Sequence, residues 1–174
     1  INRPNKLNSL HPLADEEMLD AFTKFKNHPD MLVAIVTGIG KRAFSTGRDL
    51  EYFLEHRRKD LPELKNRTPL GGITSNFTCW KPIIAAINGY ALGGGLELAL
   101  TCDIIVAADH AKLGLPEPKV GQVAEEGGVH RLPRQIPLKL AMGMILTGKQ
   151  ITAQEAHSIG IVNEVVPSGK LMST

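Results

Sequence analysis

Residues 81–108 read KPIIAAINGYALGGGLELALTCDIIVAA and contain the pattern that decides the fold. The apolar run at 83–87 is rich in isoleucine and too short for a typical helix, which predicts a strand buried on both faces. A turn at 88–89 follows, and then the glycines at 93–95 precede residues 96–100, which favour helix. A strand, a glycine turn and a helix start are therefore expected to adjoin.

The start of this helix has the features of an anion site. Backbone N–H groups at a helix start have no partner within the helix, and glycine leaves them unshielded by side chains. They can therefore point at a developing negative charge. Glu97 lies in the same first turn, where the helix dipole alone would also favour a carboxylate.

Predicted strands and helices alternate on both sides of this stretch. Upstream we expect the end of a strand at 1–4, a helix with Met18, Phe22 and Phe25 on one face, a strand at 32–37, a glycine-punctuated loop at 38–50, a helix at 51–59 and a surface loop or flap at 60–72. Downstream we expect a strand at 103–108, an irregular segment at 112–121, helices at 129–132 and 138–146, a helix begun by the capping box Thr152 to Glu155 and ended by Gly160, and a strand at 161–166. This alternation predicts an α/β architecture.

Size and composition set limits on the function. The 174 residues suit one domain, covering 1–174. The net charge of +2 is too balanced to indicate a nucleic-acid surface, and the two cysteines, Cys79 and Cys102, are predicted to be structural thiols in a reducing compartment. We find neither a bilayer-spanning run nor a signal-peptide pattern, although the chain begins at Ile1 without methionine.

Several glycine-dependent chemistries do not fit the central stretch. A P-loop needs Lys-Ser or Lys-Thr after its second glycine, but Gly94 is followed by Gly95 and Leu96. The glycine spacing also fails the dinucleotide fingerprint, and no serine stands between glycines as a nucleophile elbow requires. The six histidines show no ligand-type spacing, so we expect no metal site.

An anion hole beside a carboxylate remains, with a second carboxylate, Glu117, fixed between two prolines. This combination suits enolate chemistry, because an enolate oxyanion needs fixed donors and carboxylates can move the protons. The spacing alone leaves a simpler interpretation open. Glu97 would then be a helix-start acid and Glu117 an ordinary acid on a surface loop.

The chain resembles the crotonase superfamily, the enoyl-CoA hydratase/isomerase family. The resemblance rests on residues 2–4 with 7–8, 43–50, 82–103, 115–117 with Gly121, 127–128 with 131–132, and 147–156. It implies a spiral of ββα units, a CoA thioester substrate with no further cofactor, and a homotrimer or hexamer. Family members normally continue into a helical C-terminal region, which would lie beyond Thr174.

The resemblance also implies roles for individual residues. The backbone N–H groups of Arg48 and Gly94 would form the oxyanion hole, and Glu97 and Glu117 would be the catalytic acid–base pair. Possession of both acids favours hydration of a 2-enoyl-CoA, or the reverse dehydration, since isomerases generally keep one. Four further residues match positions along the CoA moiety: Ser9, Arg42, Asp49 and Leu50.

Residues 115–121, 127–133 and 160–163 look most like the carnitinyl-CoA dehydratase subfamily within this family. That subfamily tends to have an acid at the position of Glu125, which would face the acyl end and attract a trimethylammonium group, or else point outward into solvent. The alternatives are an enoyl-CoA isomerase or a catalytically silent interaction protein of the same fold. The resemblance implies a bacterial cytoplasmic, mitochondrial or peroxisomal setting and a protein that is not secreted.

Overall fold

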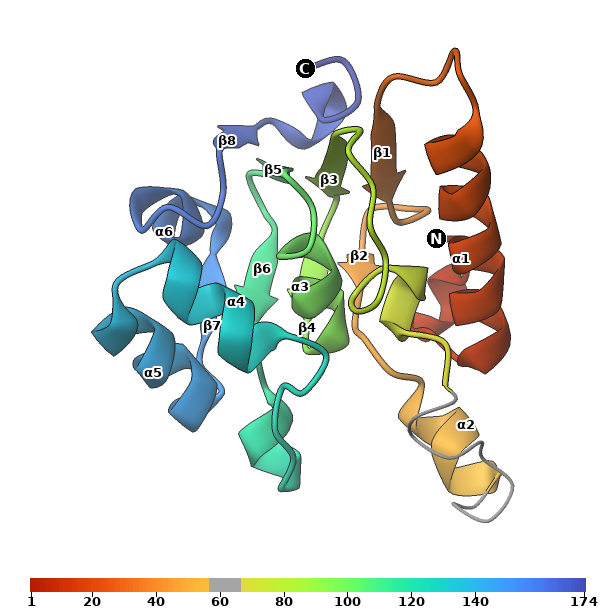
Figure 1. The fold of residues 1–174 in the computed structure, drawn as a ribbon. Coiled ribbons are helices and arrows are strands. Elements are labelled where there is room, and N and C mark those ends of the chain that lie inside the picture. The colour runs from red at the N-terminus through yellow and green to blue at the C-terminus, as the bar shows by residue number, and fades with distance from the viewer. Residues whose placement is uncertain (57–66) are drawn as a thin grey trace.

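The computed structural model describes residues 1–56 and 67–174. Figure 1 shows two groups of strands, with helices on both flanks. The strands are β1 (Ala34–Thr37), β2 (Ala43–Ser45), β3 (Ile83–Ile87), β4 (Tyr90–Leu92), β5 (Ile104–Ala108), β6 (Lys112–Gly114), β7 (Gln150–Thr152) and β8 (Glu164–Val166). The helices are α1 (Pro12–Asn27), α2 (Leu50–Glu55), α3 (Gly94–Ala99), α4 (Gly128–Gln135), α5 (Leu138–Thr147) and α6 (Ala153–Ser158).

The strands follow a spiral that contributes alternately to two sheets. Within the described residues, one sheet has the order β1-β3-β5-β8 and the other has the order β2-β4-β6-β7. All neighbours are parallel except β6 and β7. Each turn of the spiral places one strand in each sheet and then enters a helix, as in β1-β2-α2, β3-β4-α3 and β5-β6-α4. This arrangement confirms the predicted α/β spiral of ββα units.

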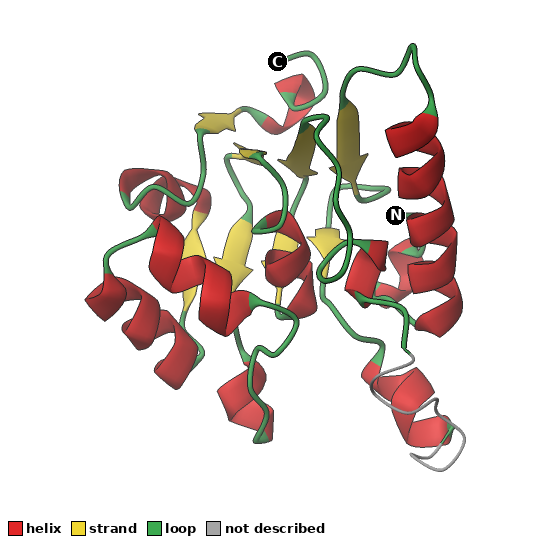
Figure 2. Cartoon of the chain, viewed as in Figure 1, coloured by secondary structure: helices red, strands yellow, loops and turns green. Residues whose placement is uncertain are grey.

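The central stretch lies in the middle of both sheets. β3 pairs with β1 on one side and β5 on the other, and most of its side chains are buried, which confirms the predicted buried strand. The predicted turn is stabilised by Asn88, whose buried amide donates to the carbonyl oxygens of Gly38 and Gly40, both at 2.7 Å. β4 follows, and α3 then begins at the predicted glycines, in front of the strands in Figure 2.

Two helices, α1 and α6, form with the features that the sequence predicts. Phe22 and Phe25 of α1 are buried, and their side chains contribute to the main hydrophobic core. The capping box of α6 is present, because the Thr152 hydroxyl accepts from the Glu155 N–H at 3.0 Å and the Glu155 carboxylate accepts from the Thr152 N–H at 2.7 Å. Cys79 and Cys102 are both free thiols, and burial raises the pKa of Cys102 to about 12.

Some short elements differ from the prediction. The expected loop at 38–50 contains β2, and the expected irregular segment at 112–121 begins with β6. β7 was not predicted. Each of these strands has three residues, too few for a readable alternation, and each exists because a neighbouring strand supplies its hydrogen bonds.

The ends of other elements also shift. β1 begins at Ala34, since Leu32 is exposed, and β8 begins only at Glu164. Ile1 is not in a strand, although its N–H and C=O groups bond to Thr37 and Ile39 beside the end of β1.

The predicted flap at 60–72 lies mostly outside the described residues, as do residues 57–59 of the helix expected at 51–59. Its described end is not a flap, because Leu70, Gly71 and Gly72 form a buried 3₁₀ turn against α1 and α3. Among residues 1–56 and 67–174, no helix combines the length and apolarity that a bilayer crossing needs.

Candidate active site

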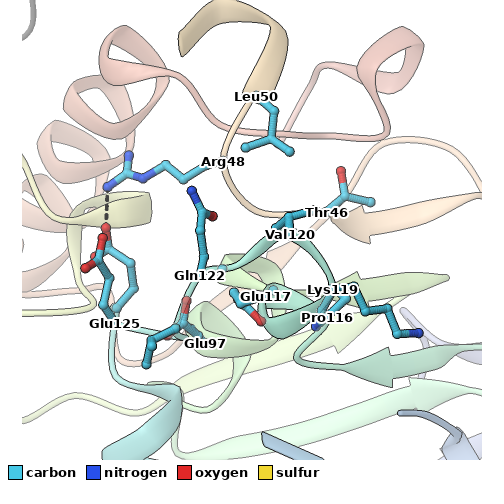
Figure 3. A pocket seen from close by; sticks show the side chains of 14 residues that line it. Thr46, Arg48, Leu50, Glu97, Pro116, Glu117, Lys119, Val120, Gln122 and Glu125 are labelled. Atoms are coloured by element: carbon cyan, nitrogen blue, oxygen red, sulfur yellow. Dashed lines mark hydrogen bonds and ion pairs between the residues drawn. The ribbon is translucent and has the colours of Figure 1, made fainter. Parts of the chain in front are cut away.

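A pocket of about 230 Å³ opens where three segments meet. These segments are the loop that leads into α2, the start of α3 and the connection from β6 to α4 (Figure 3). The pocket contains six of the predicted site residues: Arg48, Leu50, Gly94, Glu97, Glu117 and Glu125. The fold thus brings together residues that lie far apart in the sequence.

Glu97 is held rigidly at the inner end of the pocket. Its position in the first turn of α3 leaves only 2% of the residue exposed. Its Oε1 atom accepts a hydrogen bond of 2.9 Å from the Gly128 N–H at the start of α4. The pKa of Glu97 is raised to about 7, mainly by burial and also by the nearby charge of Glu117, against the lowering effect of the Gly128 bond. Glu97 can therefore hold or release a proton at neutral pH.

Glu117 faces the same pocket with fewer restraints. It begins a short 3₁₀ turn, Glu117–Val120, between two prolines. Its Oε2 atom is buried without a hydrogen-bond partner among the residues that the structure describes. Burial raises the pKa of Glu117 as well. A buried oxygen without a partner is destabilising, and such atoms in native proteins often serve a chemical role.

Two backbone N–H groups adjoin these carboxylates, because the chain at Gly47 passes directly over the start of α3. A Cβ on Gly47 would stand 2.6 Å from the Gly94 nitrogen, and Gly47 also has a φ of +80°, so only glycine fits. Neither the Arg48 N–H nor the Gly94 N–H has a hydrogen-bond partner among the described residues. Both residues line the pocket, so their N–H groups can serve an oxyanion there.

The predicted CoA residues divide into two groups. Leu50 lines the pocket with half of its surface exposed. Ser9, Arg42 and Asp49 do not line it, and their CoA contacts stay predictions. Asp49 is buried, pairs with Arg3 at 2.7 Å and caps α2 by accepting from the Tyr52 N–H.

The neighbouring acids Glu125 and Glu126 both line the pocket but differ in their contacts. Glu125 is exposed, as the mouth of a pocket requires. Glu126, which the sequence reasoning missed, forms an ion pair of 2.5 Å with the Arg48 guanidinium. Arg48 also pairs with the buried Asp15 of α1. The arginine in the glycine-containing loop between β2 and α2 could have signalled buried acidic partners, since such charges are rarely buried alone.

Comparisons with known proteins agree with this geometry. The profile described as enoyl-CoA hydratase/isomerase matches residues 1–174. The (E)-benzylidenesuccinyl-CoA hydratase of Thauera aromatica is 41% identical over 98% of this chain and 66% of its own length. The carnitinyl-CoA dehydratase of Escherichia coli K12 is 44% identical over 99% of this chain and 65% of its own length.

Solved structures give the same result. A carnitinyl-CoA dehydratase from Mycobacterium avium 104 superposes with a TM-score of 0.91 at 38% identity, covering 99% of this chain and 67% of that one. The enoyl-CoA hydratase EchA1 from Mycobacterium marinum has a TM-score of 0.89, also at 38% identity, covering 99% of this chain and 66% of that one. The chain spans about two thirds of the length of the curated relatives it matches. On the sequence match and the shared fold together, this chain belongs to the enoyl-CoA hydratase/isomerase family.

Proposed function

We propose that the protein hydrates a 2-enoyl-CoA thioester, or dehydrates the corresponding 3-hydroxyacyl-CoA. One observation carries the proposal: a single pocket is lined by two carboxylates with raised pKa values and by two backbone N–H groups that have no partner among the described residues. The carboxylates are those of Glu97 and Glu117, and the N–H groups are those of Arg48 and Gly94. Family membership supports the thioester substrate.

The proposed mechanism uses the two carboxylates on one water molecule. One ionised carboxylate takes a proton from the water as the water oxygen bonds to Cβ. The electrons of the double bond move toward Cα and the thioester oxygen, where the N–H groups of Arg48 and Gly94 stabilise the enolate. The other carboxyl group, still protonated, then gives its proton to Cα. Water is added without net oxidation or reduction, so the mechanism uses no cofactor beyond the CoA of the substrate.

The pKa shifts suit this division of labour. Two carboxylates that share a buried site resist simultaneous ionisation, so the pair tends to carry one proton and one charge. Burial raises the pKa of both, that of Glu97 to about 7. At neutral pH the pair therefore contains the acid and the base that water addition needs.

For the acyl group, we propose a cationic end of the carnitinyl or crotonobetainyl type. Glu125 lines the pocket as an exposed acid, and several of the relatives carry the name carnitinyl-CoA dehydratase. Exposed carboxylates attract a quaternary ammonium group electrostatically. The relative named (E)-benzylidenesuccinyl-CoA hydratase supplies the contrast, because an anionic aryl substrate would be repelled by Glu125.

The experiment that tests the reaction follows the absorbance of the conjugated thioester with crotonyl-CoA and crotonobetainyl-CoA. Hydration removes this absorbance. The substrate preference predicts that Glu125→Gln slows crotonobetainyl-CoA turnover selectively, by about fivefold for a charge contribution on the order of 1 kcal/mol. Equal losses on both substrates would contradict the role of Glu125.

The same assay addresses the two alternatives. An isomerase would convert a 3-enoyl-CoA to the conjugated thioester and raise the absorbance, whereas the second acid in this pocket favours hydration. A silent interaction protein would give neither signal. The trimeric or hexameric assembly is also part of the proposal, and light scattering of the purified protein would measure it.

A further inference from the structure

The Arg48 side chain is not used by an oxyanion role, which needs only the backbone N–H. Its guanidinium group nevertheless lies between the carboxylates of Asp15 and Glu126 and forms an ion pair with each. These three residues come from the loop before α2, from α1 and from the loop before α4. Only 23% of the Arg48 side chain and 1% of the Asp15 side chain are exposed. We call this group the Arg48 cluster.

Both carboxylates of the Arg48 cluster are held by further hydrogen bonds. Asp15 accepts from the Gly71 N–H at 2.7 Å. Glu126 accepts from the Thr74 hydroxyl at 3.1 Å and from the Leu70 N–H at 3.4 Å. Partly buried charges with several partners hold a fixed arrangement, because losing one partner leaves the other charge uncompensated.

The backbone on both sides of Arg48 is anchored by hydrogen bonds, and the ion pairs of the Arg48 cluster add a side-chain anchor to it. The neighbours of Arg48 are tied to Leu10 through bonds of 2.7 Å from the Leu10 N–H to the Gly47 carbonyl and 2.9 Å from the Asp49 N–H to the Leu10 carbonyl. Within residues 1–56 and 67–174, the Arg48 N–H donates to no backbone acceptor. Gly47 precedes it, and glycine restricts the backbone least of all residues.

We propose that Arg48 positions its own backbone N–H through the ion pairs of its side chain with Asp15 and Glu126. This inference rests on the proposed function, since it concerns the donor that would hold the thioester oxygen. The Arg48 cluster also connects the loop that carries the proposed oxyanion donor to the segment that holds Glu97. Glu126 contacts Arg48, and two residues later the Gly128 N–H donates to Glu97.

A cluster that only stabilises the fold would behave differently. Its loss would lower the free energy of unfolding but leave the turnover of folded molecules unchanged. A positioning role instead lowers kcat with little change in KM, because a misplaced donor weakens transition-state binding more than substrate binding. It also weakens the polarisation of the thioester carbonyl, which the red shift of a bound chromophoric thioester such as cinnamoyl-CoA reports.

The test compares Arg48→Met, Glu126→Gln and Asp15→Asn with two control variants. Asp20→Asn removes an exposed acid from the same helix as Asp15, and Glu164→Gln removes an exposed acid from β8. Asp15 is fully buried, so the test does not depend on its variant folding. Glu126, at 22% side-chain exposure, then supplies the independent evidence.

We expect Arg48→Met and Glu126→Gln to lower kcat for crotonyl-CoA by about 10- to 100-fold, with KM within about threefold. The red shift of bound cinnamoyl-CoA should shrink in both, while the controls match the wild type. Unchanged kcat and red shift in both variants, with only a lower melting temperature, would overturn the positioning role.

The two readouts separate this inference from the proposed function. A wild-type protein that hydrates crotonyl-CoA while the variants match it overturns the positioning role alone. A wild-type protein that shifts the cinnamoyl-CoA spectrum without hydrating any thioester overturns the proposed function, and the red shift in the variants then decides the positioning role. A wild-type protein with neither signal overturns both.

Discussion

The start of α3 and the connection from β6 to α4 each contribute one glutamate to the pocket, and they hold it differently. Glu97 sits on α3, a helix whose residues are all buried, with 2% of the residue exposed and a bond to Gly128. Glu117 sits on a short turn, with one oxygen that has no partner among the described residues. The pocket thus combines a fixed proton site with a less restrained one. Water addition can use both, because one proton leaves the water that attacks Cβ and the other is delivered to Cα.

The largest expected effect is on the hydration rate, which should fall whether the substituted glutamate lies on α3 or in the connection from β6 to α4. Glu97→Gln and Glu117→Gln should each lower hydration by about 10² to 10⁴, because each removes an acid–base group that acts in the reaction. Calorimetry should show that binding of the CoA thioester persists. A wild-type rate in either variant would refute the paired-acid mechanism.

The free energy of unfolding should respond very differently to substitutions at the start of α3 and in the connection from β6 to α4. A Cβ on Gly95 in α3 would stand 2.0 Å from the Ser45 carbonyl oxygen of β2, so Gly95→Ala should lower the free energy of unfolding by about 3 kcal/mol or more. Gly121 in the connection has no atom within 4 Å of such a Cβ, and its φ of +71° alone should limit the loss in Gly121→Ala to about 1 kcal/mol. Urea unfolding measures both. Equal losses would mean that the two regions are equally packed.

The raised pKa of Glu97 predicts that the protein loses stability at alkaline pH, and that Glu97→Gln avoids this loss. Its folded pKa, about 7, lies above the ordinary value of 4.5, so the stabilisation of the protonated form is complete below pH 4.5 and is lost as the pH rises through 7. Glu97→Gln stays neutral and should exceed the wild type at pH 8 by up to roughly 3 kcal/mol. Glu117→Gln should gain less, because Glu117 is less buried. Urea titrations at pH 5 and pH 8 would reveal this difference, and a gain that is independent of pH would contradict it.

The smallest expected effect is the pH dependence of the rate. If the pair works with one shared proton, kcat/KM should fall about fivefold from pH 7 to pH 8, as the group with a pKa of about 7 ionises. Stopped-flow rates across this range provide the measurement. A flat profile would place the working pKa elsewhere.

β3 and the start of α3 could be predicted from the sequence, whereas the short strands, including β6 at the start of the connection to α4, could not. The isoleucines of β3 and the glycines before α3 carry strong local signals, and both elements form where predicted. β2, β6 and β7 have three residues each, and their hydrogen bonds come from distant strands, so no local pattern announces them. Tertiary pairing determines these elements.

The residues of the site were likewise only partly predictable from local sequence patterns. Spacing alone left Glu97 and Glu117 as ordinary acids, and only the resemblance to the family made them a pair. Glu126 and Asp15 escaped prediction, because their importance depends on the Arg48 side chain that the fold places between them. Ser9, Arg42 and Asp49 match family positions but lie outside the lining of the pocket.

The most direct test of the central claim is the rate of the double variant Glu97→Gln/Glu117→Gln with crotonyl-CoA. Groups that act together on one reaction are strongly non-additive. We therefore predict that the double variant is about as slow as the slower single variant. Losses that multiply, giving a double variant slower by the product of the two single effects, would show that the glutamates act independently and would contradict the shared-water mechanism.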